Sequence, residues 1–255
     1  MFIDSDKNLE KKRYDKKAAS LLLKDSLALK LGSSAYPLTL RKPYLIYEDK
    51  IKELIKPHHK VLEIGSGTGM HTLDLVKTGA SIMATDISPK SLQMLEKNIE
   101  NNIKINNLST KVADMENLPF DDNTFDVVTC AGSLSYGQTD YVFNEIKRVL
   151  NFNGIFLCVD SLNNNFIYRL NRYIQYLKNK RAKMTILNMP TIRIINSKTK
   201  KYSNHSIQFF GGISFLMPIL TKFINNKKAA SISDAFDKFF KIKYSAFKFV
   251  LIAKV

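Results

Sequence analysis

Lys60-Val-Leu-Glu-Ile-Gly-Ser-Gly-Thr-Gly-Met-His71 is the stretch of the 255-residue chain that decides its fold. An apolar run typical of a buried strand comes first, and three glycines follow at alternate positions. Glycine permits backbone conformations closed to other residues, and it leaves room where a ligand lies against the main chain. The stretch therefore predicts a strand, a turn that approaches a ligand closely, and the start of a helix.

The spacing of the glycines and the acids around them indicate the kind of nucleotide. The glycines read G-x-G-x-G with Glu63 two residues before the first, whereas the dinucleotide fingerprint is G-x-G-x-x-G. This turn fits S-adenosylmethionine (SAM) better than a dinucleotide. Asp86 ends the next apolar run, where a carboxylate can accept hydrogen bonds from both ribose hydroxyls; a helix-capping role is the alternative. Asp114, after the following strand, could accept the adenine amino group.

Short β-branched runs alternate with amphipathic stretches from residue 60 onward, a pattern typical of βαβ units around a parallel sheet. Before residue 60 we expect one helix that Gly32 ends and a second that runs from Pro43 to about Lys56. The insertion 211–245 should help form the substrate side. We predict strands at 60–64, 81–85, 109–113, 125–130, 153–159, 206–210 and 247–253, and helices near 69–78, 89–102, 139–150 and 164–180.

The charge of the chain is concentrated in its C-terminal part. Apolar residues make up 45% and charged residues 24%, which is ordinary for a folded globular protein. The net charge is +16, and residues 151–255 hold 18 Lys/Arg against 3 Asp/Glu. Such an excess favours the capture of anionic partners, whether phosphates, acidic lipids or nucleic acid. A solvated, Lys-rich surface is the alternative.

The chain shows no sign of export or of a membrane span. The apolar stretch Gly211–Leu220 is about half the ~20 residues that a spanning helix needs, and the N-terminus lacks the basic-then-apolar order of a secretory signal. Cys130 and Cys158 form no zinc-type spacing. We expect a cytoplasmic protein without a metal. The run Ile213–Leu220, flanked by lysines, either packs in the core or rests peripherally on the inner face of the membrane.

The ordered motifs between about residues 55 and 160 resemble those of the class I SAM-dependent methyltransferases, most closely the branch containing the ubiquinone and menaquinone enzymes. They are E-x-G-x-G-x-G, Asp86, D-M-x-x-L-P-F, F-D-V-V and E-I-K-R-V-L-x-x-x-G. Asn151-Phe-Asn-Gly departs from the branch, which usually carries a proline there. The resemblance implies SAM as cofactor, with S-adenosylhomocysteine as product.

The expected fold is α/β and Rossmann-like. It consists of a mostly parallel, seven-stranded sheet with helices on both faces, an N-terminal helical lid, and a helical insertion between the last two strands. We interpret residues 1–255 as one domain, with the lid at 1–56, a cofactor-binding core at 57–160 and a basic substrate-side part at 161–255.

Carried over position by position, the resemblance implies a cofactor site. Glu63 would hold the amino end of SAM through the loop, Asp86 the ribose, and Asp114 with Met115 the adenine. Tyr14 and Tyr44 resemble aromatic positions of a lid that folds over SAM, with core packing as the alternative. The predicted cofactor residues are Tyr14, Tyr44, Glu63, Gly65, Ser66, Gly67, Gly69, His71, Asp86, Ile87, Asp114, Met115, Cys130, Ala131 and Gly132.

The acceptor is expected beyond the fourth and fifth strands. Methyl transfer is an in-line displacement, so the protein must align the acceptor and, for a hydroxyl, remove its proton. Asp160, His205 and Tyr136 are the candidate bases. Cys130 reads as a buried core thiol rather than a nucleophile. The absence of an Asn/Asp-Pro-Pro-Tyr/Phe motif after the fourth strand argues against a nucleic-acid substrate.

A looser resemblance, of residues 160–177 and 209–218, is to methyltransferases of bacterial surface-polysaccharide loci. It implies a hydroxyl of a nucleotide- or lipid-linked sugar as the acceptor. Arg169 and Arg172 are three apart on one helical face, so they either clamp an acceptor phosphate or are solvated. The alternatives are a quinone- or isoprenoid-type acceptor, an RNA, and a SAM-binding scaffold without catalysis. The sequence does not indicate the oligomeric state.

Overall fold

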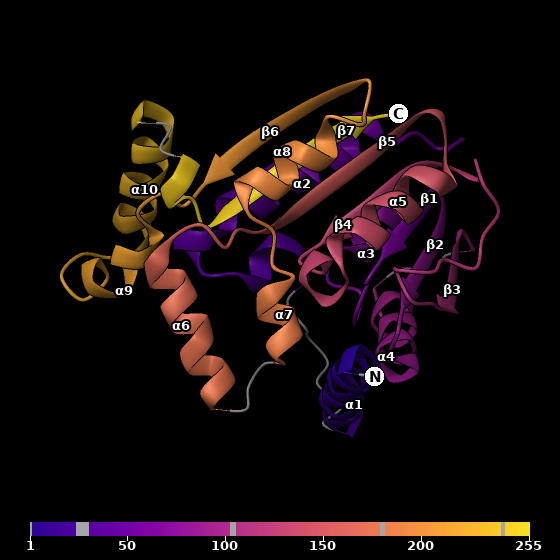
Figure 1. Cartoon of the computed structure of the whole chain (residues 1–255), viewed down its shortest axis with the longest axis horizontal. Coiled ribbons are helices and arrows are strands. Elements are labelled where there is room, and N and C mark those ends of the chain that lie inside the picture. The colour runs from indigo at the N-terminus through magenta and orange to yellow at the C-terminus, as the bar shows by residue number, and fades with distance from the viewer. Residues whose placement is uncertain (1, 24–30, 103–105, 179–181, 241–242) are drawn as a thin grey trace.

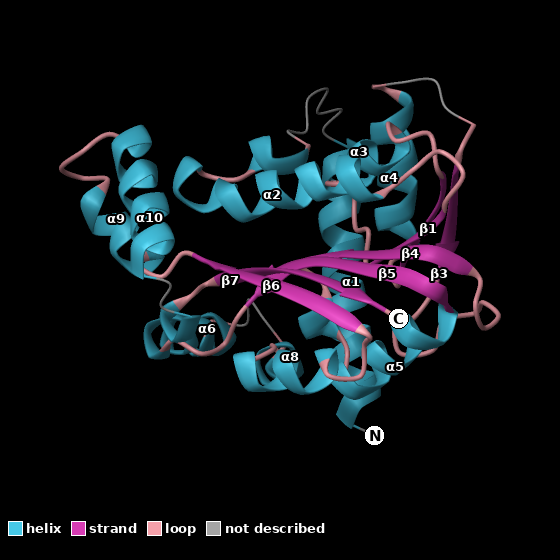
Figure 2. Ribbon diagram, turned by 90° about the horizontal axis from the view of Figure 1, so that it is seen from above, coloured by secondary structure: helices cyan, strands magenta, loops and turns pink. Residues whose placement is uncertain are grey.

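The computed structural model describes residues 2–23, 31–102, 106–178, 182–240 and 243–255. Within them lies one seven-stranded sheet, in the order β3-β2-β1-β4-β5-β7-β6 (Figures 1 and 2). Neighbouring strands among β1 to β5 are parallel, and β7 is antiparallel to both β5 and β6. The strands are β1 (Lys60–Ile64), β2 (Ser81–Asp86), β3 (Leu108–Val112), β4 (Phe125–Ala131), β5 (Leu150–Ser161), β6 (Asn204–Phe210) and β7 (Lys248–Lys254). The predicted mostly parallel sheet is confirmed.

Helices cover both faces of this sheet, as predicted. Figure 2 shows α2, α3, α4 and α10 on one side and α5, α6 and α8 on the other. The helices are α1 (Phe2–Leu23), α2 (Leu38–Leu54), α3 (Thr72–Val76), α4 (Pro89–Glu100), α5 (Thr139–Val149), α6 (Phe166–Leu177), α7 (Lys183–Leu187), α8 (Ile192–Thr199), α9 (Met217–Leu220) and α10 (Asn226–Phe240). Short 3₁₀ turns lie at η1 (Gly32–Ala35), η2 (Leu134–Tyr136), η3 (Ser214–Leu216) and η4 (Lys243–Ser245).

The apolar side chains form a core on each face of the sheet. Because successive residues of a strand point to opposite faces, Phe156 and Cys158 of β5 join the core under α5, whereas Leu157 and Val159 join the core under α2. Cys130 is fully buried beside Cys158 in the first of these cores. The strands are therefore apolar on both sides, as a covered parallel sheet requires.

The N-terminal elements differ from the sequence prediction. The second helix begins at Leu38, after the extended Pro37, so Pro43 lies inside it. Its Tyr47 and Ile51 are buried in the core under the sheet, so this helix packs on the sheet. Among the described residues of the predicted 1–56 lid, α1 and Tyr36 reach the carboxyl ends of the strands. The predicted end of the first helix at Gly32 involves residues 24–30, which lie outside the described ranges.

Two further boundaries differ for local reasons. The helix after the glycine turn covers only Thr72–Val76, because the turn itself continues through Gly69, with φ of 84°, to His71. β5 starts at Leu150 rather than 153, since the chain stays paired to β4 through a register shift near Phe125. None of the described helices is long and apolar enough to span a bilayer.

The sheet order positions the site. β1 and β4 are neighbours, and their chain connections leave in opposite directions along the sheet. In open α/β sheets, ligands bind in the crevice beyond the carboxyl ends of the strands at such a switch point. The glycine turn follows β1, and the segment Ala131–Tyr136 follows β4. Both segments therefore meet where a nucleotide is expected.

Candidate cofactor and acceptor site

The glycine turn after β1 forms the floor of a cavity. Gly67 has φ of 56°, in the left-handed region that favours glycine, and a Cβ placed on it would meet nothing within 4 Å. Its main chain therefore faces open space in which a ligand can lie. At Gly69, by contrast, an added Cβ would come within 3.0 Å of Leu95 Cγ. Gly69 serves the packing of the turn on α4.

Asp86, at the end of β2, holds this turn and faces the same cavity. Its Oδ2 accepts a hydrogen bond from the Gly67 N–H at 2.9 Å, and its Oδ1 accepts one from the Ser88 N–H at 2.8 Å. Burial raises the pKa of Asp86 above its usual value, although both backbone bonds act against this. Each carboxylate oxygen has a second lone pair, so the group can still accept ligand hydroxyls.

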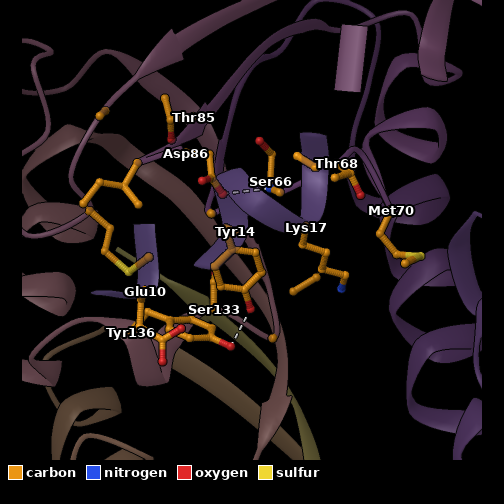
Figure 3. Close-up of a pocket in the computed structure, with 18 of the residues that line it drawn as sticks. Glu10, Tyr14, Lys17, Ser66, Thr68, Met70, Thr85, Asp86, Ser133 and Tyr136 are labelled. Carbon is orange, nitrogen blue, oxygen red and sulfur yellow. Dashed lines mark hydrogen bonds between the residues drawn. The ribbon is translucent and has the colours of Figure 1, made fainter. Parts of the chain in front are cut away.

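The cavity brings together most of the residues predicted to bind the cofactor. Figure 3 shows Ser66, Thr85 and Asp86 along one part of the cavity wall. Tyr14 and Tyr136 face one another at a different part of the wall. The predicted residues that line it are Tyr14, Gly65, Ser66, Gly67, Asp86, Ile87, Asp114, Met115, Ala131 and Gly132. Tyr136, predicted as a base, lines it too. The hydroxyls of Tyr14 and Tyr136 are hydrogen-bonded at 2.6 Å.

Glu63 lies beneath the turn and does not line the cavity. Its side chain is buried, and its Oε2 accepts a hydrogen bond from Thr72 Oγ1 at 2.6 Å. Burial raises the pKa of Glu63 to about 7, above the usual value of 4.5. A direct contact of Glu63 with a ligand is thus not formed, and its action on the cofactor would pass through the turn above it.

Two more predicted cofactor residues, Tyr44 and His71, pack in a buried aromatic cluster instead. Tyr44 stacks on Tyr36 with ring centroids 3.5 Å apart, and His71 lies parallel to Tyr44 at 5.5 Å. Burial lowers the pKa of His71 to about 4, so the imidazole is neutral. Tyr36 is the aromatic residue of this cluster that lines the cavity. Of the two readings of Tyr44, core packing is the one that the structure shows.

Cys130 is also absent from the cavity wall. The thiol is fully buried, and its Sγ lies 2.9 Å from Ser133 Oγ. Ser133 itself lines the cavity, so Cys130 supports a wall residue from behind. The prediction of a core thiol is confirmed, and the prediction of a direct cofactor contact is wrong.

Sequence reasoning missed several residues that the helix α1 brings to the cavity: Lys7, Glu10, Lys17 and Ala18. Lys7 Nζ lies 2.6 Å from Asp114 Oδ2 and 2.6 Å from Glu116 Oε2. Burial lowers the pKa of Lys7, but these two carboxylates outweigh that effect and hold the pKa above its usual value. The carboxylate predicted to bind the adenine amino group thus already has a cationic partner. No local motif marks Lys7, because its partners are 107 and 109 residues away.

The same helix is anchored on two sides of the cavity. Asp15 Oδ1 accepts a hydrogen bond from Ser88 Oγ at 2.6 Å, next to the ribose-side acid. On the other side, Glu10 Oε1 accepts hydrogen bonds from the Ala182 N–H at 3.0 Å and from Thr185 Oγ1 at 3.1 Å. Figure 1 shows α1 beside α4 and α7. The lid is therefore closed in this structure, and α7 helps to hold it.

A second cavity adjoins the first. Gly132 and Tyr136 line both cavities, so a molecule in one contacts the same two residues as a molecule in the other. The remaining walls of the second cavity come from the end of β5 and from α6, and include Asp160, Ser161, Tyr168, Asn171, Arg172 and Gln175. These segments follow the fifth strand, where the acceptor was predicted.

Asp160 is the buried acid of this second cavity. Its Oδ2 accepts a hydrogen bond from the Leu134 N–H at 2.9 Å, and its Oδ1 accepts one from the Ser161 N–H. Burial raises the pKa of Asp160, while the nearby cations Lys248 and Arg172 act in the opposite direction. Lys248 Nζ donates to Ser161 Oγ at 3.0 Å. The wall of the second cavity thus combines the acid Asp160 with the buried cation Arg172, and Lys248 lies behind it, bonded to the wall residue Ser161.

Two predicted residues lie elsewhere. His205 is exposed on β6 and pairs with Ala253, whereas the β6 residue level with Asp160 is Phe209. At about 3.4 Å per residue, His205 stands roughly 14 Å along the sheet from Asp160, so its prediction as a base is wrong. Arg169 is exposed, but Arg172 is buried and donates to Leu162 O at 2.7 Å. The two arginines do not form a clamp.

Comparison with known proteins agrees with this geometry. Residues 62–158 match the family model described as "Methyltransferase domain". The chain is 37% identical over 100 residues to demethylmenaquinone methyltransferase of Corynebacterium kroppenstedtii. The matched region covers 39% of this chain and 40% of the relative. It is 30% identical over 118 residues to the ubiquinone/menaquinone biosynthesis C-methyltransferase UbiE of Zymomonas mobilis, with 45% and 48% covered. The chain thus spans less than half the length of these relatives.

Solved structures share the fold. A phosphoethanolamine N-methyltransferase 2 of Haemonchus contortus, in complex with phosphomonomethylethanolamine and S-adenosylhomocysteine, superimposes with a TM-score of 0.59 at 16% identity, over 87% of this chain and 53% of that one. The family match begins in β1 and ends in β5, so it includes the glycine turn, Asp86 and Asp114. Residues 62–158 thus resemble a methyltransferase domain, and the fold around them is that of the class I, SAM-dependent type that the motifs predict.

Proposed function

We propose that this protein transfers a methyl group from SAM to a small-molecule acceptor held in the second cavity. The observation that carries the proposal is the pair of adjoining cavities that share Gly132 and Tyr136. One has the glycine turn and Asp86 of a nucleotide site, and the other has a buried acid, Asp160, and a buried cation, Arg172. Such a pair suits a transfer reaction, which needs two reactants aligned at a common wall.

The residues of the first cavity fit SAM. Ser66 Oγ is buried, lines the cavity and has no hydrogen-bond partner among the described residues, and buried polar atoms without partners are rare unless a ligand or water satisfies them. Gly67 leaves the main chain open to the ligand. Asp86 would accept from the ribose hydroxyls. Asp114 would receive the adenine amino group together with the cation of Lys7, since a carboxylate oxygen accepts more than one hydrogen bond.

For the acceptor we propose a hydroxylated aromatic ring of the quinone type with an isoprenoid chain. The support is the pair of relatives named for menaquinone and ubiquinone methylation, together with the buried cations near Asp160. A sugar acceptor, our first interpretation of the sequence, has no support among these relatives. Lys248 and Arg172 would stabilise the negative charge of an ionised ring hydroxyl.

The chemistry follows from that charge. SAM supplies an electrophilic methyl group. Asp160 would take the proton of a ring hydroxyl, which makes the adjacent ring carbon nucleophilic. As that carbon bonds to the methyl group, the methyl–sulfur bond of SAM would break and S-adenosylhomocysteine would leave. The methylated carbon would then lose its proton to solvent, and the ring oxygen would regain one from Asp160. Asp160 is the base that the geometry favours, because it lines the acceptor cavity and burial raises its pKa toward the working range of a base. Tyr136 would align the ring at the shared wall.

The test is methyl transfer by the purified protein to a short-chain naphthoquinol and to a benzoquinol, followed by mass spectrometry. We expect one added methyl group on ring carbon. Asp160→Asn should lower kcat by about 100-fold without changing the Kd for SAM, whereas Asp121→Asn, an exposed acid, should change neither. Methylation of an activated sugar but of neither quinol would overturn the proposed acceptor. Failure to bind SAM would overturn the proposed reaction.

A further inference from the structure

The helix α6 has two functional faces. Tyr168, Asn171, Arg172 and Gln175 recur at helical spacing and line the acceptor cavity. Of these, Tyr168 and Arg172 are buried. This inner face therefore belongs to the proposed acceptor site, and it fixes how the helix is rotated on the body of the protein.

The opposite face of α6 is apolar and exposed. Its side chains are 38–73% exposed, and no part of the described chain covers them. They are Phe166, Ile167, Leu170, Tyr173, Ile174 and Leu177, which we call the α6 stripe. Single exposed apolar residues are ordinary, but a contiguous apolar patch on one helix marks an interaction surface. Figure 1 shows α6 at the edge of the molecule, with its outer side free of other elements.

Cationic residues lie within α6 and follow it in the sequence. Arg169 is exposed within the helix, and α6 contains no acidic residue. Directly after it the sequence reads Lys178-Asn-Lys-Arg-Ala-Lys183, which holds four cations and no acid. An amphipathic helix with large apolar side chains and adjacent lysines and arginines is typical of segments that lie in the interface of an anionic bilayer.

We infer that the α6 stripe docks this protein on an anionic lipid bilayer. The inference rests on the proposed function, because a lipid-linked acceptor would be delivered from that bilayer. A second copy of the chain is a poorer occupant, since α6 carries Arg169 and no acid, and two stripes packed together would bring like charges toward one another without a negative partner. Residues 151–255 hold 18 Lys/Arg against 3 Asp/Glu, so a negative surface is the complementary partner.

The two faces of α6 connect docking to catalysis. When the stripe lies in the headgroup layer, the inner face of the same helix holds the acceptor cavity directly behind it. The reacting ring then enters between α6 and the end of β5, and its isoprenoid chain stays in the bilayer. This arrangement spares the apolar chain a passage through water, which would cost free energy in proportion to its exposed area.

Co-sedimentation with vesicles tests the inference without any methyl transfer. The full-length protein is mixed with vesicles of phosphatidylcholine alone or with added phosphatidylglycerol. We expect binding to the anionic vesicles. Leu170→Glu with Ile174→Glu should weaken it at least tenfold, and charge reversal at Lys178, Lys180 and Arg181 should remove the preference for phosphatidylglycerol. Phe152→Glu is the matched control, because Phe152 is 85% exposed at the far end of β5, and it should bind as the wild type does.

Independent measurements separate the outcomes. Circular dichroism and the Kd for SAM should be unchanged in all variants, since Leu170, Ile174, Lys178 and Phe152 are not among the residues that line the two cavities. If the wild type, the Leu170→Glu/Ile174→Glu variant and the charge-reversal variant all bound anionic vesicles equally, the proposed docking surface would be overturned. A dimer in light scattering that becomes a monomer with Leu170→Glu and Ile174→Glu would instead assign the stripe to a second copy. Vesicle binding by a protein that methylates neither quinol would leave docking in place and overturn only the proposed acceptor.

Discussion

The cofactor side and the acceptor side of this protein are built in different ways. On the cofactor side, the turn after β1 and the acid at the end of β2 form one connected group, with Asp86 bonded to the Gly67 N–H. On the acceptor side, Asp160, Arg172 and Lys248 come from three separate elements, the end of β5, α6 and the start of β7, and meet only through folding. A nucleotide site made from main chain is visible as spacing in the sequence, whereas an acceptor site made from isolated side chains has no spacing to recognise.

The largest effect should come from Asp86→Ala. The carboxylate would accept two ribose hydrogen bonds, and hydrogen bonds to charged groups contribute about 1.5–3 kcal/mol each. We expect the Kd for SAM to rise at least about 100-fold in isothermal titration calorimetry, with acceptor binding unchanged. Asp121→Ala is the control. If Asp86→Ala bound SAM with the Kd of the wild type, the glycine turn and Asp86 would not act together in binding the cofactor.

The next effect concerns Glu63, the acid beneath the turn. Its folded pKa of about 7 lies above its usual value of 4.5, so the folded state holds the proton more tightly. The contribution of Glu63 to stability is complete below pH 4.5 and is lost as pH rises through 7. That difference corresponds to at most roughly 3.4 kcal/mol, and the hydrogen bond from Thr72 is already included in this pKa.

Glu63→Gln removes this titration. Chemical denaturation of the ligand-free protein at pH 4.5 and pH 8 should show the variant gaining stability relative to wild type as pH rises. The exposed Glu53→Gln should track the wild type at both pH values. A constant difference between wild type and Glu63→Gln would mean that folding leaves the pKa of Glu63 unshifted, and would overturn this prediction.

A moderate effect is expected at Arg172, on the acceptor side. Arg172→Lys keeps the charge but loses the planar fork that bonds Leu162 O and Asn163 Oδ1. We expect the KM for the acceptor to rise about tenfold, while the Kd for SAM stays constant. Arg169→Lys, the same change on the exposed side of the same helix, should leave both constants unchanged. Equal effects of the two changes would contradict the separation of the two faces of α6.

The smallest effect is expected at the boundary between the two sides. The hydroxyls of Tyr14 and Tyr136 are hydrogen-bonded at 2.6 Å, and a neutral hydrogen bond contributes about 0.5–1.5 kcal/mol. Tyr14→Phe and Tyr136→Phe should each raise the KM for SAM a few-fold. The KM for SAM of the double variant should not exceed that of the more impaired single variant, because both changes remove the same hydrogen bond. Additive losses would show that each hydroxyl contacts a ligand separately.

The fold was largely predictable from the sequence because its strands are continuous apolar runs bounded by turn residues. The run that ends at Asp86 and the capped helix start at Ser88 both appear where the pattern indicates, with Ser88 Oγ accepting from the Ser91 N–H at 3.0 Å. Boundaries failed where a neighbour decided them. β5 begins early because β4 continues to pair with it, and the second helix begins at Leu38 because Pro37 starts it before Pro43 is reached.

The site was predictable only where main chain and ligand are adjacent. His205 was a poor prediction, because a favourable unperturbed pKa says nothing about where an edge strand places the residue. Lys7 and Tyr36 had no local signal, since their roles depend on helices and turns that fold back over the cavity. The aromatic pair Tyr36 and Tyr44 illustrates the limit: the sequence indicates that tyrosines lie near the lid, and only packing decides which one faces the ligand.

The bond between Glu10 and the start of α7 has a kinetic consequence. Because Glu10 accepts hydrogen bonds from Ala182 and Thr185, close in the chain to α6, opening of the lid requires these bonds to break, at about 1.5–3 kcal/mol each. Exchange of spent nucleotide for fresh nucleotide then waits on a movement beside the acceptor cavity. Turnover would accordingly follow a compulsory order, with the nucleotide bound first and released last, and with its departure as the slow step.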